Sequence, residues 1–134
     1  MKILIVEDEL IIALATADTL RQHGHEIAPL ARDEPQAMRS AESFLPDLAL
    51  VDWELARGST GASVALKLWQ QFGIRTIFVS DAVAARRTPP SQYVVGFLRK
   101  PFSPEQLLAK VIAASVQNEC GASRKENLAI SPVR

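Results

Sequence analysis

Four consecutive apolar residues run directly into a carboxylate in the segment Leu48-Ala49-Leu50-Val51-Asp52-Trp53-Glu54-Leu55. An unbroken apolar run of this kind is typical of a strand that is buried on both faces of a parallel sheet. Asp52 therefore stands at the carboxyl end of a central strand. Taken alone, such an aspartate is most often a helix cap or a turn residue, so the other segments of the chain decide its role.

The composition is that of one globular domain. The chain has 134 residues, of which 48% are hydrophobic and 22% are charged, and its formal net charge is zero. This balance gives no electrostatic argument for nucleic acid as a partner. The one cysteine, Cys120, has no internal disulfide partner, the N-terminus has no apolar signal-peptide core, and no apolar run is long enough to span a bilayer. We therefore expect a cytoplasmic protein with no membrane partner.

Strand-like and helix-like segments alternate along the chain. Short apolar runs predict five strands, and Pro29 places the second of them near an edge, because proline gives up one hydrogen bond of the ladder. Periodicity and capping residues predict five helices, and four of them are regular. The fourth in chain order is short or distorted, because Pro89-Pro90 ends it. The predicted strands are residues 2–6, 25–31, 47–52, 75–80 and 94–100, and the predicted helices are 10–23, 34–44, 62–72, 81–87 and 104–117.

Apolar residues at helical spacing predict which side of each helix faces the sheet. We interpret Gly58 and Gly61 as ordinary loop glycines, and Trp53 and Trp69 as packing residues. The predicted apolar faces are Ile11, Leu14, Ala15, Ala17 and Leu20 in the first helix, Val64, Ala65, Leu68, Trp69 and Phe72 in the third, and Leu107, Leu108, Val111, Ile112 and Val116 in the last.

Five strands separated by helices predict a parallel α/β sheet covered on both faces, with its ligand site at the carboxyl ends of the strands. Glu7, Asp8, Asp52, Ser80 and Lys100 all stand at such ends, so we expect them to meet. Crowded carboxylates repel one another, and Mg²⁺ is the hard cation that oxygen ligands and phosphates favour. The Lys100 ammonium and the Ser80 hydroxyl remain available to bind an anion. Taken alone, the acids Glu7-Asp8-Glu9 are more simply explained as favourable charges at a helix N-terminus.

In their order and position, these motifs resemble those of two-component response-regulator receiver domains over about residues 1–117. The resemblance implies a flavodoxin-like, doubly wound (βα)5 fold with strand order 2-1-3-4-5. Residues 118–134 are expected to form a flexible polar tail that is too short for an effector. The matching segments are Ile3-Leu4-Ile5-Val6-Glu7-Asp8-Glu9, Asp47-Leu48-Ala49-Leu50-Val51-Asp52, Phe78-Val79-Ser80 and Gly96-Phe97-Leu98-Arg99-Lys100-Pro101-Phe102.

The resemblance also implies roles for the acidic residues. Asp52 is the expected nucleophile, which accepts a phosphoryl group as a mixed anhydride. Asp8 and Asp52 are expected to bind Mg²⁺ directly and Glu7 through a water, with the backbone carbonyl of Glu54 completing the protein's ligands. The metal neutralises charge between the anionic nucleophile and the anionic phosphoryl group.

The remaining site residues are expected to bind the phosphoryl group and to move in response to it. By resemblance, Lys100 holds one phosphoryl oxygen and Ser80 hydrogen-bonds another, which pulls the loop after the fourth strand inward. Phe97 stands at the aromatic switch position and is expected to rotate inward, although it is equally well explained as a core residue. The Lys100–Pro101 peptide bond is expected to be cis.

The function implied is a phosphorylation-dependent switch of the stand-alone, chemotaxis-regulator kind. A histidine kinase or a histidine phosphotransfer protein supplies the phosphoryl group, and the output passes through contacts with an unknown downstream protein, without a DNA-binding domain. The chain is expected to be a monomer or weak homodimer and no enzyme, beyond catalysing its own phosphoryl transfer and dephosphorylation. A fragment of a longer protein would carry the same sequence.

Three features depart from the family pattern. Asp81 follows Ser80 where a small neutral residue is usual, Glu54 stands two residues after Asp52, and Pro89-Pro90 interrupts the expected fourth helix. Asp81 and the irregular fourth helix motivate a second hypothesis, a receiver-fold interaction module that works without phosphorylation. An independent phosphatase of similar architecture ranks last, because Glu54 replaces the second catalytic aspartate that it requires.

Overall fold

A five-stranded parallel sheet forms the middle layer of the molecule in the computed structural model, which describes residues 1–55, 58–81 and 92–116. The strands lie in the order β2-β1-β3-β4-β5, and every adjacent pair is parallel. The predicted fold class and strand order are therefore confirmed. The strands are β1 (Lys2–Val6), β2 (Glu26–Ile27), β3 (Leu48–Asp52), β4 (Arg75–Ser80) and β5 (Val94–Arg99).

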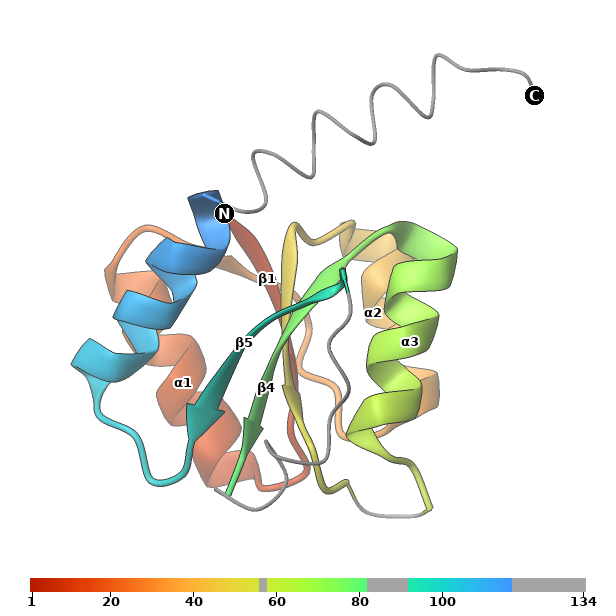
Figure 1. The fold of residues 1–134 in the computed structure, drawn as a ribbon, viewed down its shortest axis with the longest axis horizontal. Coiled ribbons are helices and arrows are strands. Elements are labelled where there is room, and N and C mark those ends of the chain that lie inside the picture. Colours follow the sequence, from red (N-terminus) through yellow and green to blue (C-terminus); the bar gives the residue numbers. More distant parts are fainter. Residues whose placement is uncertain (56–57, 82–91, 117–134) are drawn as a thin grey trace.

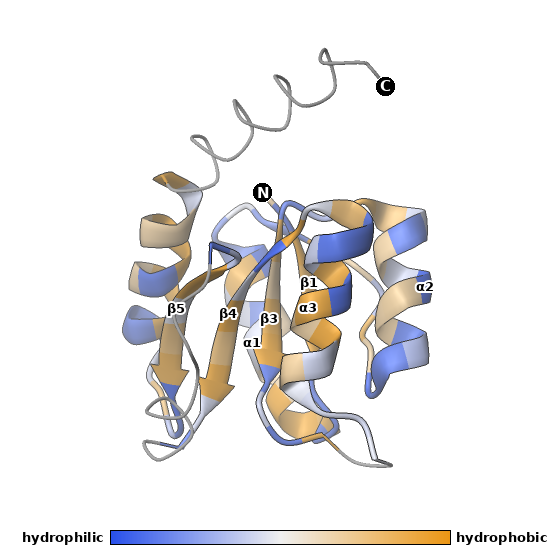
Figure 2. Ribbon diagram, turned by 45° about the vertical axis from the view of Figure 1, so that its right-hand side comes forward, coloured by the Kyte–Doolittle hydropathy of each residue, from blue (hydrophilic) through white to orange (hydrophobic). Residues whose placement is uncertain are grey.

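Helices cover both faces of the sheet, as the alternating pattern predicted (Figure 1). One face carries α1 (Leu10–Gln22) and a C-terminal helix over residues 104–116, and the other carries α2 (Glu34–Phe44) and α3 (Gly61–Phe72). Each face has its own hydrophobic core, and the central strands between them are apolar along most of their length (Figure 2). None of the helices in the described ranges is long and apolar enough to cross a membrane.

The capping residues begin and end the helices where the sequence predicts. Asp33 accepts a hydrogen bond from the backbone N–H of Gln36 at the start of α2. Ser103 and Gln106 form a reciprocal capping box at the start of the C-terminal helix, with distances of 3.1 and 2.8 Å. Gly73 ends α3 in the left-handed conformation with φ at 68°.

The second strand is shorter than predicted, although it does lie at the edge of the sheet. Only Glu26–Ile27 is a regular strand, whereas the prediction covered residues 25–31. Beyond it, Ala28 and Ala31 still donate hydrogen bonds to β1, at 2.9 and 3.1 Å. Pro29 lies between them, and the ladder resumes one residue later than the alternation of Glu26 and Ala28 would place it, at Ala31 and not at Leu30.

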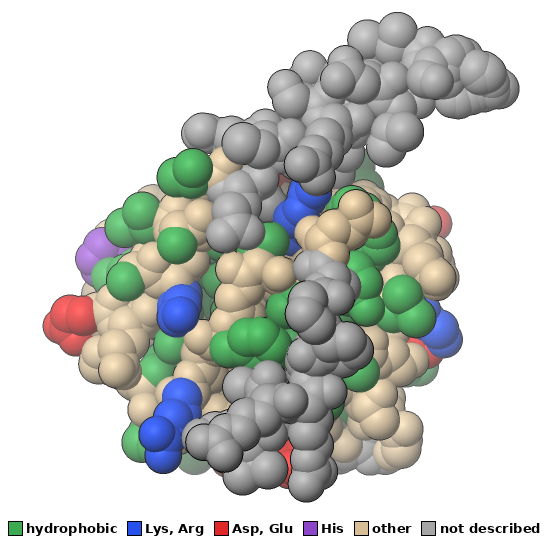
Figure 3. Space-filling view, viewed as in Figure 1, with side chains coloured by type: hydrophobic (Ala, Val, Ile, Leu, Met, Phe, Trp, Pro, Cys, Tyr) green, Lys and Arg blue, Asp and Glu red, His purple; other side chains and the backbone are tan. Residues whose placement is uncertain are grey.

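The predicted apolar faces were partly wrong for two helices. In α1, Ala17 and Leu20 are buried, but Ile11 is 84% exposed and Leu14 is 50% exposed. In the C-terminal helix, Ile112 and Val116 are also exposed, and Figure 3 shows apolar side chains on this side of the molecule. The small residues Ala13 and Ala114 are buried instead and let the helices approach the sheet closely.

Some predictions fall outside the described residues. The short helix expected over residues 81–87 lies outside the described residues except for Asp81, and the expected tail covers residues 118–134. The domain boundary at residue 117 lies at the edge of the same undescribed range. These three remain predictions.

Candidate functional site

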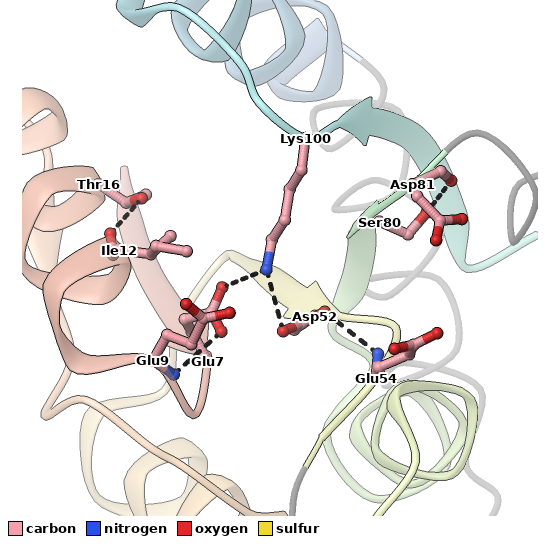
Figure 4. A network of polar contacts seen from close by, with 9 residues as sticks. All are labelled: Glu7, Glu9, Ile12, Thr16, Asp52, Glu54, Ser80, Asp81 and Lys100. Atoms are coloured by element: carbon pink, nitrogen blue, oxygen red, sulfur yellow. Dashed lines mark hydrogen bonds and ion pairs between the residues drawn. The ribbon is translucent and has the colours of Figure 1, made fainter.

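The carboxyl ends of β1, β3, β4 and β5 meet at one pocket of about 420 Å³, as the parallel topology requires. Figure 4 shows the Lys100 amine reaching between Glu7 and Asp52 from the end of β5. The predicted meeting of the five strand-end side chains is therefore observed, while their roles remain predictions. The described residues that line the pocket are Asp8, Glu9, Asp52, Glu54, Leu55, Ser80, Asp81 and Lys100.

Asp52 is fixed at both of its carboxylate oxygens. It is the last residue of β3 and is 6% exposed. Its Oδ1 accepts a hydrogen bond of 3.1 Å from the backbone N–H of Glu54, and its Oδ2 lies 3.2 Å from the Lys100 Nζ. These two contacts orient the carboxylate at the mouth of the pocket. The first of them, from the N–H two residues along the chain, is typical of a turn residue, which is one of the roles that the sequence left open for Asp52.

Three acidic side chains gather at this end of the sheet. Carboxylate oxygens of Glu7, Asp8 and Asp52 lie within 4.8 Å of one another. Burial of Glu7, and then its hydrogen bond with Asp52, raises the pKa of Glu7 to about 7. Burial is the larger cause of this raised pKa, and the neighbouring Asp52 carboxylate is the smaller one. Three converging carboxylates are a donor set that fits Mg²⁺.

Lys100 is the cation of the site. Its Nζ lies 2.9 Å from Glu7 Oε1 and 3.2 Å from Asp52 Oδ2. Burial alone lowers the pKa of Lys100, but its contacts with Glu7 and Asp52 outweigh burial and raise that pKa. The predicted cis bond between Lys100 and Pro101 is present.

Ser80 lines the pocket with its hydroxyl turned toward its own loop. The side chain is buried, and its Oγ donates a 2.9 Å hydrogen bond to the backbone carbonyl of Asp81. The exposed Asp81 lies beside it at the rim of the pocket. Phosphate binding by Ser80 thus requires its hydroxyl to exchange partners.

Phe97 is not among the described residues that line the pocket. Its ring lies 5.9 Å from the ring of Phe78, which in turn lies 5.0 Å from the ring of Trp53. Phe97 is partly buried against the core beneath α2 and α3. This position is compatible with both of its predicted roles, a core residue and a moving switch.

Gly61 is a site residue that the sequence interpretation missed. A Cβ atom at this position would lie 2.3 Å from the carbonyl oxygen of Asp52 and 2.8 Å from the Cα of Trp53. The interpretation of Gly61 as an ordinary loop glycine was therefore wrong, because it is the first residue of α3 and packs on the Asp52 backbone. The one available signal was its position after the capping residue Thr60.

An apolar groove of about 500 Å³ adjoins the pocket between α1 and the start of the C-terminal helix. Lys100 lines both hollows. Ile11 stands at the groove with 84% of its surface exposed. The other described lining residues are Ile12, Ala15, Thr16, Thr19, Pro101, Phe102, Pro104 and Leu107.

Comparisons with known proteins agree with this fold. The family model described as response regulator receiver domain matches residues 3–112. The phyllosphere-induced regulator PhyR of Methylorubrum extorquens is 32% identical over 126 residues, which cover 93% of this chain and 47% of that protein. The transcriptional regulatory protein PdtaR of Mycobacterium tuberculosis is 32% identical over 113 residues, which cover 82% of this chain and 54% of that protein. The chain thus spans about half the length of these relatives.

A solved structure shows the same arrangement of elements. The solution NMR structure of the Erythrobacter litoralis PhyR response regulator REC domain matches with a TM-score of 0.74 and 30% sequence identity. The match covers 87% of this chain and 92% of that one. The similarity therefore extends over nearly the whole of that domain.

Proposed function

The chain belongs to the response regulator receiver domain family, and from this premise we propose that it is a phosphorylation-dependent signalling switch. Asp52 accepts a phosphoryl group from a histidine kinase or a histidine phosphotransfer protein in the cytoplasm. The phosphorylated chain then signals through contacts with a downstream protein. The chain catalyses only its own phosphoryl transfer and dephosphorylation.

In the transfer step, a carboxylate oxygen of Asp52 forms a bond to phosphorus while the phosphorus–nitrogen bond of phosphohistidine breaks. The leaving imidazole takes up a proton at its nitrogen. Catalysis of such a step depends mainly on positioning and on charge stabilisation. The hydrogen bond from the Glu54 N–H, at 3.1 Å, supplies positioning for Asp52.

The position of Lys100 is the observation that carries this proposal. Its ammonium lies within 3.2 Å of the Asp52 carboxylate at the pocket, so it also lies next to any group attached there. An ammonium in this place holds a phosphoryl oxygen by a charge-assisted hydrogen bond. Ser80 gives a second contact when its hydroxyl leaves the Asp81 carbonyl.

The acidic cluster supports a role for Mg²⁺. Asp8 and Asp52 hold the ion directly, Glu7 holds it through a water, and the Glu54 backbone carbonyl completes the protein's ligands. Their close approach supports this assignment, since carboxylate oxygens of three of these residues lie within 4.8 Å of one another. When bound, Mg²⁺ neutralises charge between the carboxylates and the incoming phosphoryl group.

The groove beside the pocket supports a protein as the phosphoryl donor. Its described lining is predominantly apolar, and it meets the pocket at Lys100. An exposed apolar hollow of this kind is typical of a protein interaction site. A donor protein bound in this groove, against α1 and the C-terminal helix, places its phosphohistidine at the pocket.

Labelling with phosphoramidate tests the proposal, because this small donor carries a phosphorus–nitrogen bond like that of phosphohistidine. We expect Mg²⁺-dependent addition of one phosphoryl group to the parent chain, seen by intact mass spectrometry. Asp52→Asn is expected to abolish the addition. Asp18→Asn is the matched control, because Asp18 is an exposed residue of α1 that hydrogen-bonds Gln22. Equal labelling of Asp52→Asn and the parent contradicts the assignment of Asp52.

A second candidate is an interaction module that works without phosphorylation. It is favoured by the extra acids Glu54 and Asp81, which line the pocket and add negative charge where a phosphoryl group has to enter. Under this function Asp52→Ala binds the downstream partner as well as the parent does, and the parent shows no Mg²⁺ affinity. A pull-down that compares the parent with Asp52→Ala separates the two functions.

A further inference from the structure

Glu34, the first residue of α2, is tied to the region that follows Asp52, although it is not among the described residues that line the pocket. Its backbone N–H donates a 3.2 Å hydrogen bond to Ser59 Oγ. Its Oε1 accepts a 2.8 Å hydrogen bond from Ser63 Oγ, and its Oε2 pairs with the Lys67 ammonium. One residue of α2 thus contacts the loop before α3 and the first two turns of α3.

The charge of Glu34 strengthens these contacts. The Lys67 ammonium, and then the Ser63 hydroxyl, lowers the pKa of Glu34, so the side chain is anionic near neutral pH. The carboxylate is 22% exposed, whereas the Lys67 side chain is 45% exposed. A pair at this depth contributes modestly to stability, but it fixes the direction in which Glu34 points.

The start of α3 in turn lies directly on the backbone around Asp52. The Gly61 N–H donates a 3.0 Å hydrogen bond to the Trp53 carbonyl, and Thr60 pairs with Glu54 in an isolated antiparallel bridge. A Cβ on Gly61 would lie 2.3 Å from the Asp52 carbonyl oxygen, so the two segments are already in contact. A displacement of the start of α3 therefore displaces the backbone of residues 52–54.

We propose that Glu34 is a positioning residue for the Asp52 site. Its contacts fix the start of α3, and α3 fixes the backbone that orients the Asp52 carboxylate and presents the Glu54 carbonyl. The inference rests on the proposed function, because it assigns Glu34 an effect on Mg²⁺ binding. Loss of the Glu34 carboxylate is expected to weaken Mg²⁺ binding about tenfold, at the low end of the range for residues that orient metal ligands.

A purely structural role for Glu34 predicts a different result. In that case Glu34 only fastens α2 to α3, and its loss lowers stability without a change in metal affinity. Ser40 provides the matched control, because its Oγ donates a 2.7 Å hydrogen bond from α2 to the Pro29 carbonyl beside β2. Ser40→Ala removes a hydrogen bond that holds the same helix, α2, but this hydrogen bond does not contact α3.

The experiment compares Glu34→Ala, Glu34→Gln and Ser40→Ala in a Trp69→Phe background, where Trp53 is the sole tryptophan. Mg²⁺ affinity is measured by titration of Trp53 fluorescence, and acrylamide quenching of Trp53 is measured without metal. Thermal melts show that each variant is folded at the temperature of the titration. Glu34→Gln keeps an acceptor for Ser63 and loses the charge that pairs with Lys67, so it remains informative if Glu34→Ala does not fold.

The positioning role predicts about tenfold weaker Mg²⁺ binding and stronger Trp53 quenching for Glu34→Ala, with about threefold weaker binding for Glu34→Gln. Ser40→Ala is expected to lower the melting temperature and leave both readouts unchanged. Affinities within about twofold of the parent for both Glu34 variants overturn the positioning role and leave the proposed function intact. A parent that binds no Mg²⁺ instead overturns the metal part of the proposed function, and Trp53 quenching then decides alone whether Glu34 positions this backbone.

Discussion

The two ends of the sheet each hold a cation, and they hold it in different ways. At the carboxyl ends, the Lys100 ammonium lies between the carboxylates of Glu7 and Asp52, at 2.9 and 3.2 Å. At the amino ends, the guanidinium of the buried Arg75 lies 5.1 Å from the centre of the Trp69 ring. The Arg75 Nε also donates a 3.2 Å hydrogen bond to the Gln92 carbonyl. Both of these Arg75 partners are uncharged.

The difference separates the proposed phosphorylation site from a packing site. At Lys100 three clustered carboxylates accompany one ammonium, and burial, followed by the contact with Asp52, raises the pKa of Glu7 to about 7. Such a site gains stability when it takes up a metal ion. At Arg75 an aromatic ring and a backbone carbonyl contact the guanidinium and contribute to its stabilisation. The partly exposed Lys100 among several carboxylates thus fits the proposed chemistry, whereas the buried Arg75 fits a packing role.

The largest expected effect comes from removing the cation at the carboxyl ends. Lys100→Met is expected to slow labelling of Asp52 by phosphoramidate by at least about 100-fold, because the transferring group loses its charged donor. Mg²⁺ affinity is expected to be retained, since the three clustered carboxylates remain. The rate of labelling and a magnesium titration check the two parts. Labelling of Lys100→Met at the rate of the parent would contradict the proposed role of Lys100 in phosphoryl transfer.

The corresponding change at the amino ends is expected to affect stability and not labelling. Arg75→Leu loses the contact with the Trp69 ring and leaves the Gln92 carbonyl without that donor, so the free energy of unfolding is expected to fall by about 2–3 kcal/mol. Urea unfolding measures this loss. The labelling rate per folded molecule is expected to stay within about twofold of the parent, because the two ends are independent. A large fall in that rate would mean that the ends are coupled.

A change of pH is expected to act at the carboxyl ends with two opposite signs. The pKa of Glu7 is raised from 4.5 to about 7 in the folded chain, so Glu7 carries a proton below about pH 7. A ligand has to lose its proton before it helps to bind a metal, so Mg²⁺ affinity is expected to rise about tenfold between about pH 6 and about pH 8. Without metal, the stabilising contribution of protonated Glu7 is full below 4.5 and is lost as the pH rises through about 7.

Glu7→Gln is the control for this prediction, because it keeps the shape of the side chain and cannot titrate. In Glu7→Gln, the Mg²⁺ affinity and the metal-free melting temperature are expected to lose the part of their pH dependence that Glu7 causes in the parent. Fluorescence titrations and thermal melts at several pH values, with and without Mg²⁺, measure both slopes. Identical slopes in the parent and in Glu7→Gln would assign the pH dependence to another group.

Much of the fold and the meeting of the site residues followed from local sequence features. Apolar runs that end in polar residues located the strands, and parallel pairing brought the polar ends of those strands together. The helix faces were less predictable where a helix is apolar on several sides. The start of α1 contains Leu10-Ile11-Ile12-Ala13-Leu14, and the sheet buries Ala13 while Ile11 and Leu14 stay exposed. Close approach of the helix to the sheet selected the small residue.

The contacts around the site that the sequence did not reveal join distant segments of the chain. Gly61 was missed because its constraint is the Asp52 carbonyl, which reaches it only after β3 and α3 have packed. Glu34 was missed because its partners Ser59, Ser63 and Lys67 lie 25, 29 and 33 residues away in the chain. Neither residue belongs to a motif, and a single sequence contains no signal for such pairings.

The smallest expected effect uses the two tryptophans, which lie at opposite ends of the sheet. Trp53 follows Asp52 and meets the ring of Phe78 edge-on, whereas Trp69 stacks on Tyr93 beside Arg75. Mg²⁺ is expected to change the fluorescence of the Trp69→Phe variant and to leave that of the Trp53→Phe variant unchanged, because salt screens charge effects beyond about 10 Å. Parallel titrations of the two variants measure this difference. Equal responses would show that metal binding changes the surroundings of Trp69 at the amino ends. Arg75 would then take part in the conformational switch as well as in packing.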